Sequence, residues 1–107
     1  MIGLRSDDAK IVSDAVLSAA LYSGDGAWAE QLAYRLIDHS EPVVRGNALL
    51  SLAHIARVHG TLDRQRAIDV LRAAKNDRDE FVRGQANDAL EDVQHYIKRN
   101  GRWIGGD

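Results

Sequence analysis

The sequence predicts an all-α protein, because signals for β-strands are missing while signals for helices recur along the chain. Proline occurs once, at Pro42, among 107 residues. No stretch alternates β-branched and polar residues between turn residues, as a half-buried strand does. Glycines such as Gly24, Gly60 and Gly101 instead separate stretches in which apolar residues recur every three or four positions. We expect about five helices in one domain, since the chain is too short for two cores.

The first two helices are predicted over about residues 8–23 and 27–38. Asp7 or Asp8 provides an N-cap for the first helix, because a carboxylate accepts hydrogen bonds from free backbone amides at a helix start. The turn around Gly24 ends it. The second helix carries Leu32 and Leu36 at i, i+4 spacing, which is typical of an amphipathic helix.

The third and fourth helices follow the only proline. Pro42 opens the third helix, since proline in the first turn loses only a donor that has no helical partner, and Gly60 ends it. Thr61 or Asp63 caps the fourth helix, which is predicted over about residues 64–75.

The fifth helix is predicted over about residues 79–99, where Asn100 and Gly101 form a helix stop. An irregular tail is expected over residues 102–107. The domain is therefore expected to span residues 1–107, with the first helix as its N-terminal cap.

Two helix pairs repeat along the chain. The stretch Glu41-Pro-Val-Val-Arg-Gly-Asn-Ala aligns with Asp79-Glu-Phe-Val-Arg-Gly-Gln-Ala at an offset of 38 residues, so that Arg45 corresponds to Arg83. At the same offset the helix with Leu32 falls on the helix after Asp63, so the repeated unit is a helix pair. Repeated pairs that stack bury a continuous core, which favours a short α-solenoid of antiparallel pairs.

This pattern, a short helix, an acidic turn, Val-Arg-Gly-x-Ala and then Leu and Ile or Val at helical spacing, resembles the HEAT repeat family over about residues 27–97. In that family a turn Asp and the Arg six residues later form a ladder between successive repeats. Asp77 and Arg83 match this ladder, and Arg45 is the equivalent arginine of the preceding unit, where His39 stands at the Asp position. The resemblance thus implies HEAT-like pairs and a structural role for these residues.

The segments Val44-Arg-Gly, Leu52 to Gly60 and Thr61-Leu-Asp also look like those of small, single-domain bacterial HEAT-type proteins. Some of those proteins are immunity proteins against polymorphic or contact-dependent toxins. The resemblance therefore implies that this chain binds and neutralises a cognate toxin domain, for example a nuclease. The alternative is a generic scaffold or a self-associating adaptor, since the first helix is apolar on nearly all sides, with Leu17 and Leu21 off its core stripe. The free chain is expected to be a monomer or a weak homo-oligomer.

The candidate binding residues lie on the helix faces opposite the expected core stripes. In a HEAT-like stack the second helix of each pair lines the concave surface, where solenoids commonly bind partners. Leu50 is either an exposed apolar anchor framed by polar residues or a residue packed on Leu17 or Leu21. We define the α-helical strip expected to bind a partner as Asn47, Leu50, His54, Arg57, Gln85, Asp88, Glu91, Asp92 and His95.

Three of these residues, Asp88, Glu91 and Asp92, form an acidic patch. Such a patch is complementary to a cationic partner surface and would steer association electrostatically. It is equally the pattern of an ordinary solvated helix face.

Catalytic and cofactor-binding patterns are missing from the sequence. The chain has no cysteine, which excludes thiol nucleophiles, disulfides and cysteine-based zinc sites. His54 and His59 are five residues apart, which differs from the i, i+4 spacing of a helical metal pair, and no glycine-rich loop follows a strand. We therefore expect no enzymatic activity, no cofactor and no metal.

The charge distribution argues against nucleic acid and membrane partners. Fourteen basic and 16 acidic residues give a net charge of -2, which lacks the basic footprint of a nucleic-acid-binding domain. The basic residues around Arg64 to Arg78 alternate with acidic ones, as on a salt-bridged solvent face. No apolar run is long enough to cross a bilayer and the first five residues lack the apolar stretch of a signal peptide, so a cytoplasmic location is expected.

Overall fold

The computed structural model describes residues 8–97, and this part of the chain forms five α-helices. The prediction of an all-α fold is confirmed over that range. The last helix is predicted to reach about residue 99, but it ends at Tyr96, because Ile97 is extended with φ of -117° and ψ of 119°. The expected helix stop at Asn100 and Gly101 and the expected tail at 102–107 lie outside the described residues. The helices are α2 (Ala9–Tyr22), α3 (Gly26–Leu36), α4 (Pro42–His59), α5 (Arg64–Ala74) and α6 (Glu80–Tyr96).

Aspartate side chains determine where four of these helices begin. The carboxylate of Asp8 accepts a hydrogen bond from the backbone amide of Lys10 at 2.9 Å. Asp25, Asp63 and Asp79 cap α3, α5 and α6 in the same way, each through the backbone amide three residues later. Each cap satisfies an amide that has no partner within the helix. Between the two residues expected to cap α5, the structure therefore selects Asp63.

The remaining helix, α4, has no side-chain cap but starts with Pro42. It ends at Gly60, whose φ of 69° is left-handed and whose amide donates to the carbonyl of Ala56 at 3.0 Å. A residue with a Cβ is strained in that conformation, which explains a glycine at this position.

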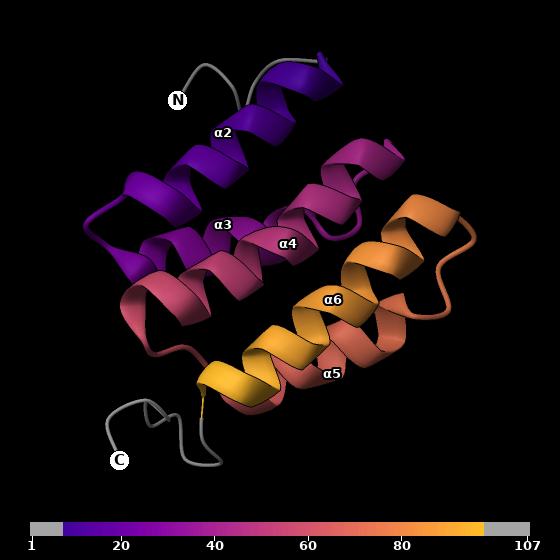
Figure 1. The fold of residues 1–107 in the computed structure, drawn as a ribbon. Coiled ribbons are helices and arrows are strands. Elements are labelled where there is room, and N and C mark those ends of the chain that lie inside the picture. Colours follow the sequence, from indigo (N-terminus) through magenta and orange to yellow (C-terminus); the bar gives the residue numbers. More distant parts are fainter. Residues whose placement is uncertain (1–7, 98–107) are drawn as a thin grey trace.

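The helices form two layers (Figure 1). In one layer α2, α4 and α6 lie side by side and run in the same direction, and α3 and α5 form the other layer. Helix α4 is central, because it contacts α2, α3 and α6, whereas α2 lies at one edge of its layer and α6 at the other. The molecule is accordingly flat, with extents of 43 × 31 × 15 Å.

The side chains that are buried on each helix depend on where the helix lies in its layer. Leu49, Leu52 and Ile55 of α4 are at most 1% exposed, and buried residues of α4 point in several directions because helices surround it. Helix α6 has a single buried stripe, formed by Val82, Ala86, Ala89, Leu90 and Val93.

Within residues 8–97, no helix combines the length and the hydropathy needed to span a membrane.

Candidate functional site

An ion pair ties the turn before α6 to the start of α4. The Nε and Nη2 groups of Arg45 donate to the two carboxylate oxygens of Asp77, each at 3.0 Å. The Nη1 group of Arg45 donates to the carbonyls of His39 and Ser40 at 3.0 and 3.1 Å. The guanidinium holds the pKa of Asp77 below its usual value, and Asp77 raises the pKa of Arg45. This link between successive helix pairs involves two of the three residues for which a structural role is predicted.

The third residue, Arg83, repeats one part of that arrangement. Its Nη1 donates to the backbone carbonyl of Asp77 at 2.8 Å, as Nη1 of Arg45 donates to the carbonyl of His39. Both contacts join an arginine to the carbonyl six residues earlier. The carboxylate of Asp77 thus binds the arginine of the preceding pair, and Arg83 binds only the main chain of this turn.

His39 forms the same hydrogen bond within its turn as Asp77 forms at the equivalent position, with the amide two residues later. Its Nδ1 accepts a hydrogen bond from the amide of Glu41 at 3.0 Å, while Oδ1 of Asp77 accepts from the amide of Asp79 at 2.9 Å. Helix α2 begins at Ala9 and α4 at Pro42, so the residue of α2 equivalent to Arg45 is Val12, a buried residue that has no charge with which to bind a carboxylate. The side chain of His39 therefore needs only to accept the hydrogen bond from the amide of Glu41 that closes its own turn.

A second contact between the pairs is steric. Gly46 follows Arg45 in α4, and a Cβ added to it would lie 2.3 Å from Cε2 of Phe81. The ring of Phe81 therefore lies directly on the backbone of α4. Gly46 permits this close approach of α6, which explains the glycine at this position of α4.

The predicted strip lies on a face shared by α4 and α6. Nδ1 of His54 and Nη2 of Arg57 are 2.9 Å apart on α4. The pKa of His54 is lowered, first by partial burial and then by the charge of Arg57, and the carboxylate of Asp92 on α6 opposes this shift. Helices α4 and α6 pack side by side, and the charge of Asp92 on α6 acts on His54 of α4, which favours one surface shared by the two helices.

Two residues of the strip, Asn47 and Leu50, are partly buried within the fold. The side-chain amide of Asn47 donates to the hydroxyl of Ser13, a buried residue of α2. Leu50 is half-buried, as are Leu17 and Leu21 of α2. Asn47 thus joins α4 to α2 and presents only part of its surface to solvent.

The residues of α6 divide in a similar way. Asp88, Glu91 and His95 are exposed, whereas Gln85 and Asp92 are half-buried. Glu91 corresponds in the repeat to Ala53 of α4, which is buried. Because α6 is the last helix of its layer, Glu91 faces the open edge of α6, about 100° around the helix from Asp92.

Sequence reasoning missed two apolar residues on this surface. Val43 and Phe81 are 40% and 44% exposed and occupy equivalent repeat positions in the first turns of α4 and α6. Val43 lies seven residues before Leu50, and Phe81 lies seven before Asp88, so each shares a helix face with the strip. Continuing the strip by two helical turns toward the N-termini of α4 and α6 would have identified both residues. We call Val43, Phe81 and the residues of the predicted strip other than Glu91 together the inner face.

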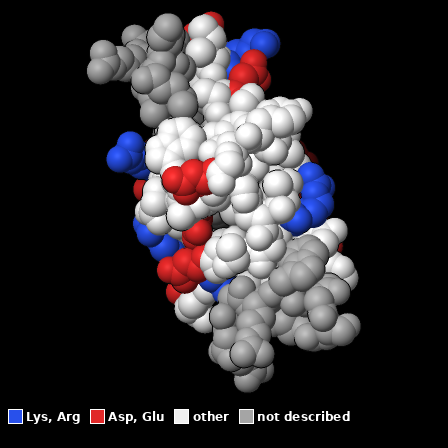
Figure 2. All heavy atoms as spheres, turned by 90° about the vertical axis from the view of Figure 1, so that its left-hand side faces the viewer, with Lys and Arg blue, Asp and Glu red and all other residues white. Residues whose placement is uncertain are grey.

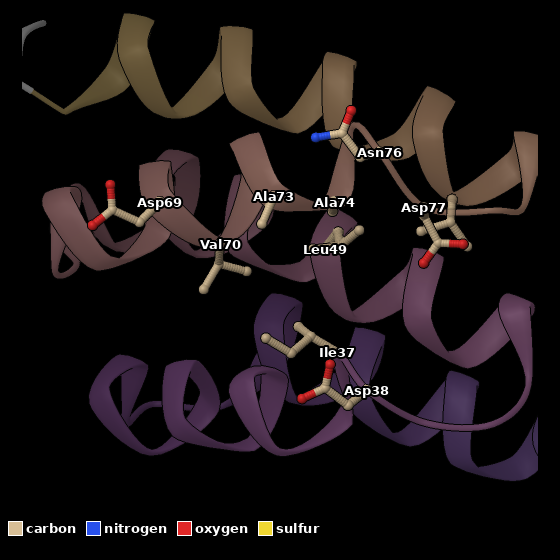
Figure 3. Close-up of a pocket in the computed structure, with 10 residues that line it drawn as sticks. Ile37, Asp38, Leu49, Asp69, Val70, Ala73, Ala74, Asn76 and Asp77 are labelled. Carbon is tan, nitrogen blue, oxygen red and sulfur yellow. The ribbon is translucent and has the colours of Figure 1, made fainter.

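A groove of about 410 Å³ opens on the other layer, between α3 and α5 (Figure 3). Ile37 at the end of α3 and Val70 of α5 extend into it, and Leu49 of α4 contributes to its lining. Asp38, Asp69 and Asp77 are the charged residues that line it. Of these three carboxylates, that of Asp77 is paired with Arg45.

Contacts of Tyr34 and Glu30 hold α3 and α5 together elsewhere. The guanidinium carbon of Arg66 lies 3.9 Å from the ring centroid of Tyr34, whose hydroxyl donates to Glu30 at 2.7 Å. Glu30 also accepts from the amide of Asp63 at 3.0 Å. Burial and the carboxylate of Glu30 raise the pKa of Tyr34. These contacts make the start of α5 a fixed part of the structure.

Charged side chains do not gather into one patch on the face that Figure 2 shows. Uncharged residues cover most of this face, and the acidic and basic residues on it are interspersed, with several acidic ones left of its centre. Among residues 8–97, no group of three or more His, Asp or Glu side chains has an arrangement that could hold a metal ion.

Comparison of the chain with protein-family models, curated proteins and solved structures finds no match.

Proposed function

We propose that this chain is a non-catalytic protein-binding module whose two helix pairs stack as in HEAT repeats, and that it binds its partner through the inner face. The equivalent hydrogen bonds of Arg45 and Arg83 support the repeat relationship, since both arginines bind the carbonyl six residues earlier. The parallel arrangement of α4 and α6 places the second helices of the two pairs side by side. A stack of this kind offers an extended surface for a partner.

The observation that carries this proposal is the distribution of apolar and charged groups on the inner face. Val43 and Phe81 expose apolar surface at one end of α4 and α6. Arg57, Asp88 and His95 expose polar groups further along. Protein interfaces commonly combine apolar anchors with a surrounding polar rim.

The partner that we propose is a toxin domain, and the chain would neutralise it as an immunity protein in the bacterial cytoplasm. This part of the proposal rests on the sequence resemblance of the repeats to small bacterial HEAT-type proteins. The carboxylates of Asp88 and Asp92 suit a cationic surface, such as the substrate cleft of a nuclease. Such a protein acts by covering that surface in a one-to-one complex.

Co-expression with the protein encoded next to this chain tests the proposal. The gene immediately upstream is expected to encode a large secreted protein with a variable C-terminal domain, and that domain is expected to arrest growth alone and to be harmless with this chain. The purified proteins are expected to form a stable one-to-one complex by sedimentation. If that domain arrests growth equally with and without the chain and no complex forms, toxin neutralisation is wrong.

A scaffold or self-associating adaptor is the second candidate. It is favoured by exposed apolar residues away from the inner face, namely Ile11 at 44%, Tyr22 at 83% and Trp28 at 42%. Sedimentation of the isolated protein separates the two functions. A stable homo-oligomer that dissociates on Tyr22→Asp substitution supports the adaptor, and a monomer over the same concentration range supports capture of a different protein.

A further inference from the structure

The contact between the two helix pairs depends on two consecutive residues at the edge of α4. Arg45 binds the carboxylate of Asp77 through two hydrogen bonds of 3.0 Å, and Gly46 provides the space that the ring of Phe81 fills. The segment that packs on this edge of α4 is the start of α6. It has an aspartate, Asp77, in the turn before the helix and an aromatic residue, Phe81, four positions later.

Helix α6 presents the same two residues at its own edge. Arg83 and Gly84 correspond to Arg45 and Gly46 at the 38-residue offset. A Cβ added to Gly84 would meet no heavy atom of the described part of the chain within 4 Å, in contrast to 2.3 Å at Gly46. Within residues 8–97, Arg83 forms no ion pair, and its Nη1 donates to the carbonyl of Asp77, which orients it as the carbonyl of His39 orients Arg45.

Among residues 8–97, no contact explains the glycine at position 84. It lies exposed in the interior of α6, where glycine is less favourable than alanine because it loses more backbone entropy. Gly46 needs to be glycine because Phe81 contacts it, but no side chain in the described structure makes that demand at Gly84.

We propose that Arg83 and Gly84 form a docking edge for a helical hairpin of a partner protein that has an aspartate in its turn and an aromatic residue four positions later. The carboxylate binds the guanidinium of Arg83 in the two-point geometry seen at Arg45, and the aromatic ring covers the backbone of α6 at Gly84. The occupied edge of α4 is the precedent for both contacts, since the proposed interface continues the α4–α6 interface by one step.

The residues further along the same edge of α6 are polar, which limits how far the proposed contact can extend. The residues of α4 in line with Arg45 include Ala53 and Ala56, both buried, whereas the corresponding residues of α6 are Glu91 and Gln94, both exposed. A continuous apolar contact along the whole helix is therefore missing at α6. The partner helix is expected to contact α6 through its first two turns and to diverge beyond them.

A peptide of residues 76–97 of this chain is the probe, because this segment already occupies the equivalent edge of α4. It is synthesised with a hydrocarbon staple between positions 84 and 88, which are exposed in α6, because an isolated helix of this length is only marginally stable. Titrated into the isotopically labelled full chain, it is expected to shift the backbone amide resonances of residues 80–88. Binding at about 1 mM or tighter is expected for a contact of this size.

Variants of both molecules test the two contacts separately. Peptides with Asp77→Asn or Phe81→Ala are expected to bind about tenfold more weakly, and Gly84→Leu in the full chain is expected to weaken binding at least as much, because the side chain occupies the space of the ring. Gly24→Ala is the matched control, since Gly24 also has no atom within 4 Å of an added Cβ, and it is expected to leave binding unchanged.

The proposal is overturned if the peptide does not bind at millimolar concentration, if its resonance shifts lie away from α6, or if Gly84→Leu leaves the affinity unchanged while circular dichroism shows an intact fold. None of these readouts uses a toxin domain, so failure here is distinguishable from failure of the proposed immunity function.

Discussion

Arg45 and Asp77 form a two-point ion pair across the boundary between the two helix pairs, with side chains that are 6% and 17% exposed. Arg45 also binds the carbonyls of the turn that precedes its own helix, so one guanidinium connects the turns before α4 and α6. The pair therefore sets the position of α5 and α6 relative to α4. Removing either partner leaves the other charge partly buried and unpaired, which is costly.

Arg45→Ala and Asp77→Asn are each expected to lower the free energy of unfolding by about 2–3 kcal/mol, because the remaining group loses charge-assisted hydrogen bonds in a poorly solvated site. Urea unfolding followed by circular dichroism measures this. The matched control is Lys10→Ala, which removes the exposed Lys10–Asp14 pair, with side chains 83% and 61% exposed, and is expected to leave the midpoint unchanged. Equal effects of Lys10→Ala and Arg45→Ala would contradict a structural role for the Arg45–Asp77 pair.

The same pair predicts a specific acid dependence of stability. The pKa of Asp77 is lower in the folded state than in the unfolded chain, so its contribution is fully present above the unfolded value of about 4 and is lost as the pH falls through the folded pKa. The stability difference between the parent chain and Asp77→Asn is therefore expected to be constant from about pH 5 to 8 and to shrink below about pH 4. Urea titrations across that range test this. A difference that persists unchanged at the lowest pH would show that Asp77 does not stabilise the fold through its charge.

The two repeat glycines are expected to respond in opposite directions to the same substitution. Gly46→Ala brings a methyl group against Phe81 and is expected to destabilise the fold by about 1–3 kcal/mol. Gly84→Ala meets nothing and is expected to stabilise it by about 0.5–1 kcal/mol through helix propensity. Thermal unfolding of both variants measures the contrast. Adding Phe81→Ala to Gly46→Ala should remove the steric part of the penalty, and a double variant in which the effects simply add would argue against the contact.

The protonation of His54 is expected to report on the shared surface of α4 and α6. Its pKa is lowered by burial and by Arg57, while Asp92 raises it. Arg57→Ala is therefore expected to raise the pKa of His54, and Asp92→Asn is expected to lower it further. NMR titration of the imidazole resonances measures both changes. If Asp92→Asn leaves the titration of His54 unaltered, the two helices do not share this surface.

His54 also contributes to the pH dependence of stability. Since its folded pKa lies below the unfolded value of about 6.5, its contribution is present above that pH and is lost as the pH falls through the folded pKa. His54→Asn is expected to flatten the stability profile just below pH 6.5. An identical slope for parent and variant in urea titrations between pH 5 and 7 would contradict this.

Local signals allowed the helices to be predicted, and tertiary contacts account for what was missed. Asp63 and Gly60 act on amides and carbonyls within a few residues, so the sequence reveals their roles directly. The repeat pattern likewise identifies Asp77, but whether its carboxylate binds Arg45 or Arg83 depends on how the pairs pack. Phe81 looks like a core residue in a helix pattern. Its ring is nevertheless 44% exposed, and the equivalent residue of the central helix α4, Val43, is 40% exposed, because both lie in the first turn on the face that α4 and α6 share.

The central claim is that α4 and α6 present one partner-binding face, and the affinity of matched variants for the proposed toxin domain tests it most directly. Val43→Asp and Ile11→Asp place the same charge in the first turns of α4 and α2, at side chains that are 40% and 44% exposed. By isothermal titration calorimetry, Val43→Asp is expected to weaken the complex at least about tenfold, while Ile11→Asp binds as the parent chain does. Unchanged affinity for Val43→Asp together with a loss for Ile11→Asp would place the binding surface on α2 and contradict the account.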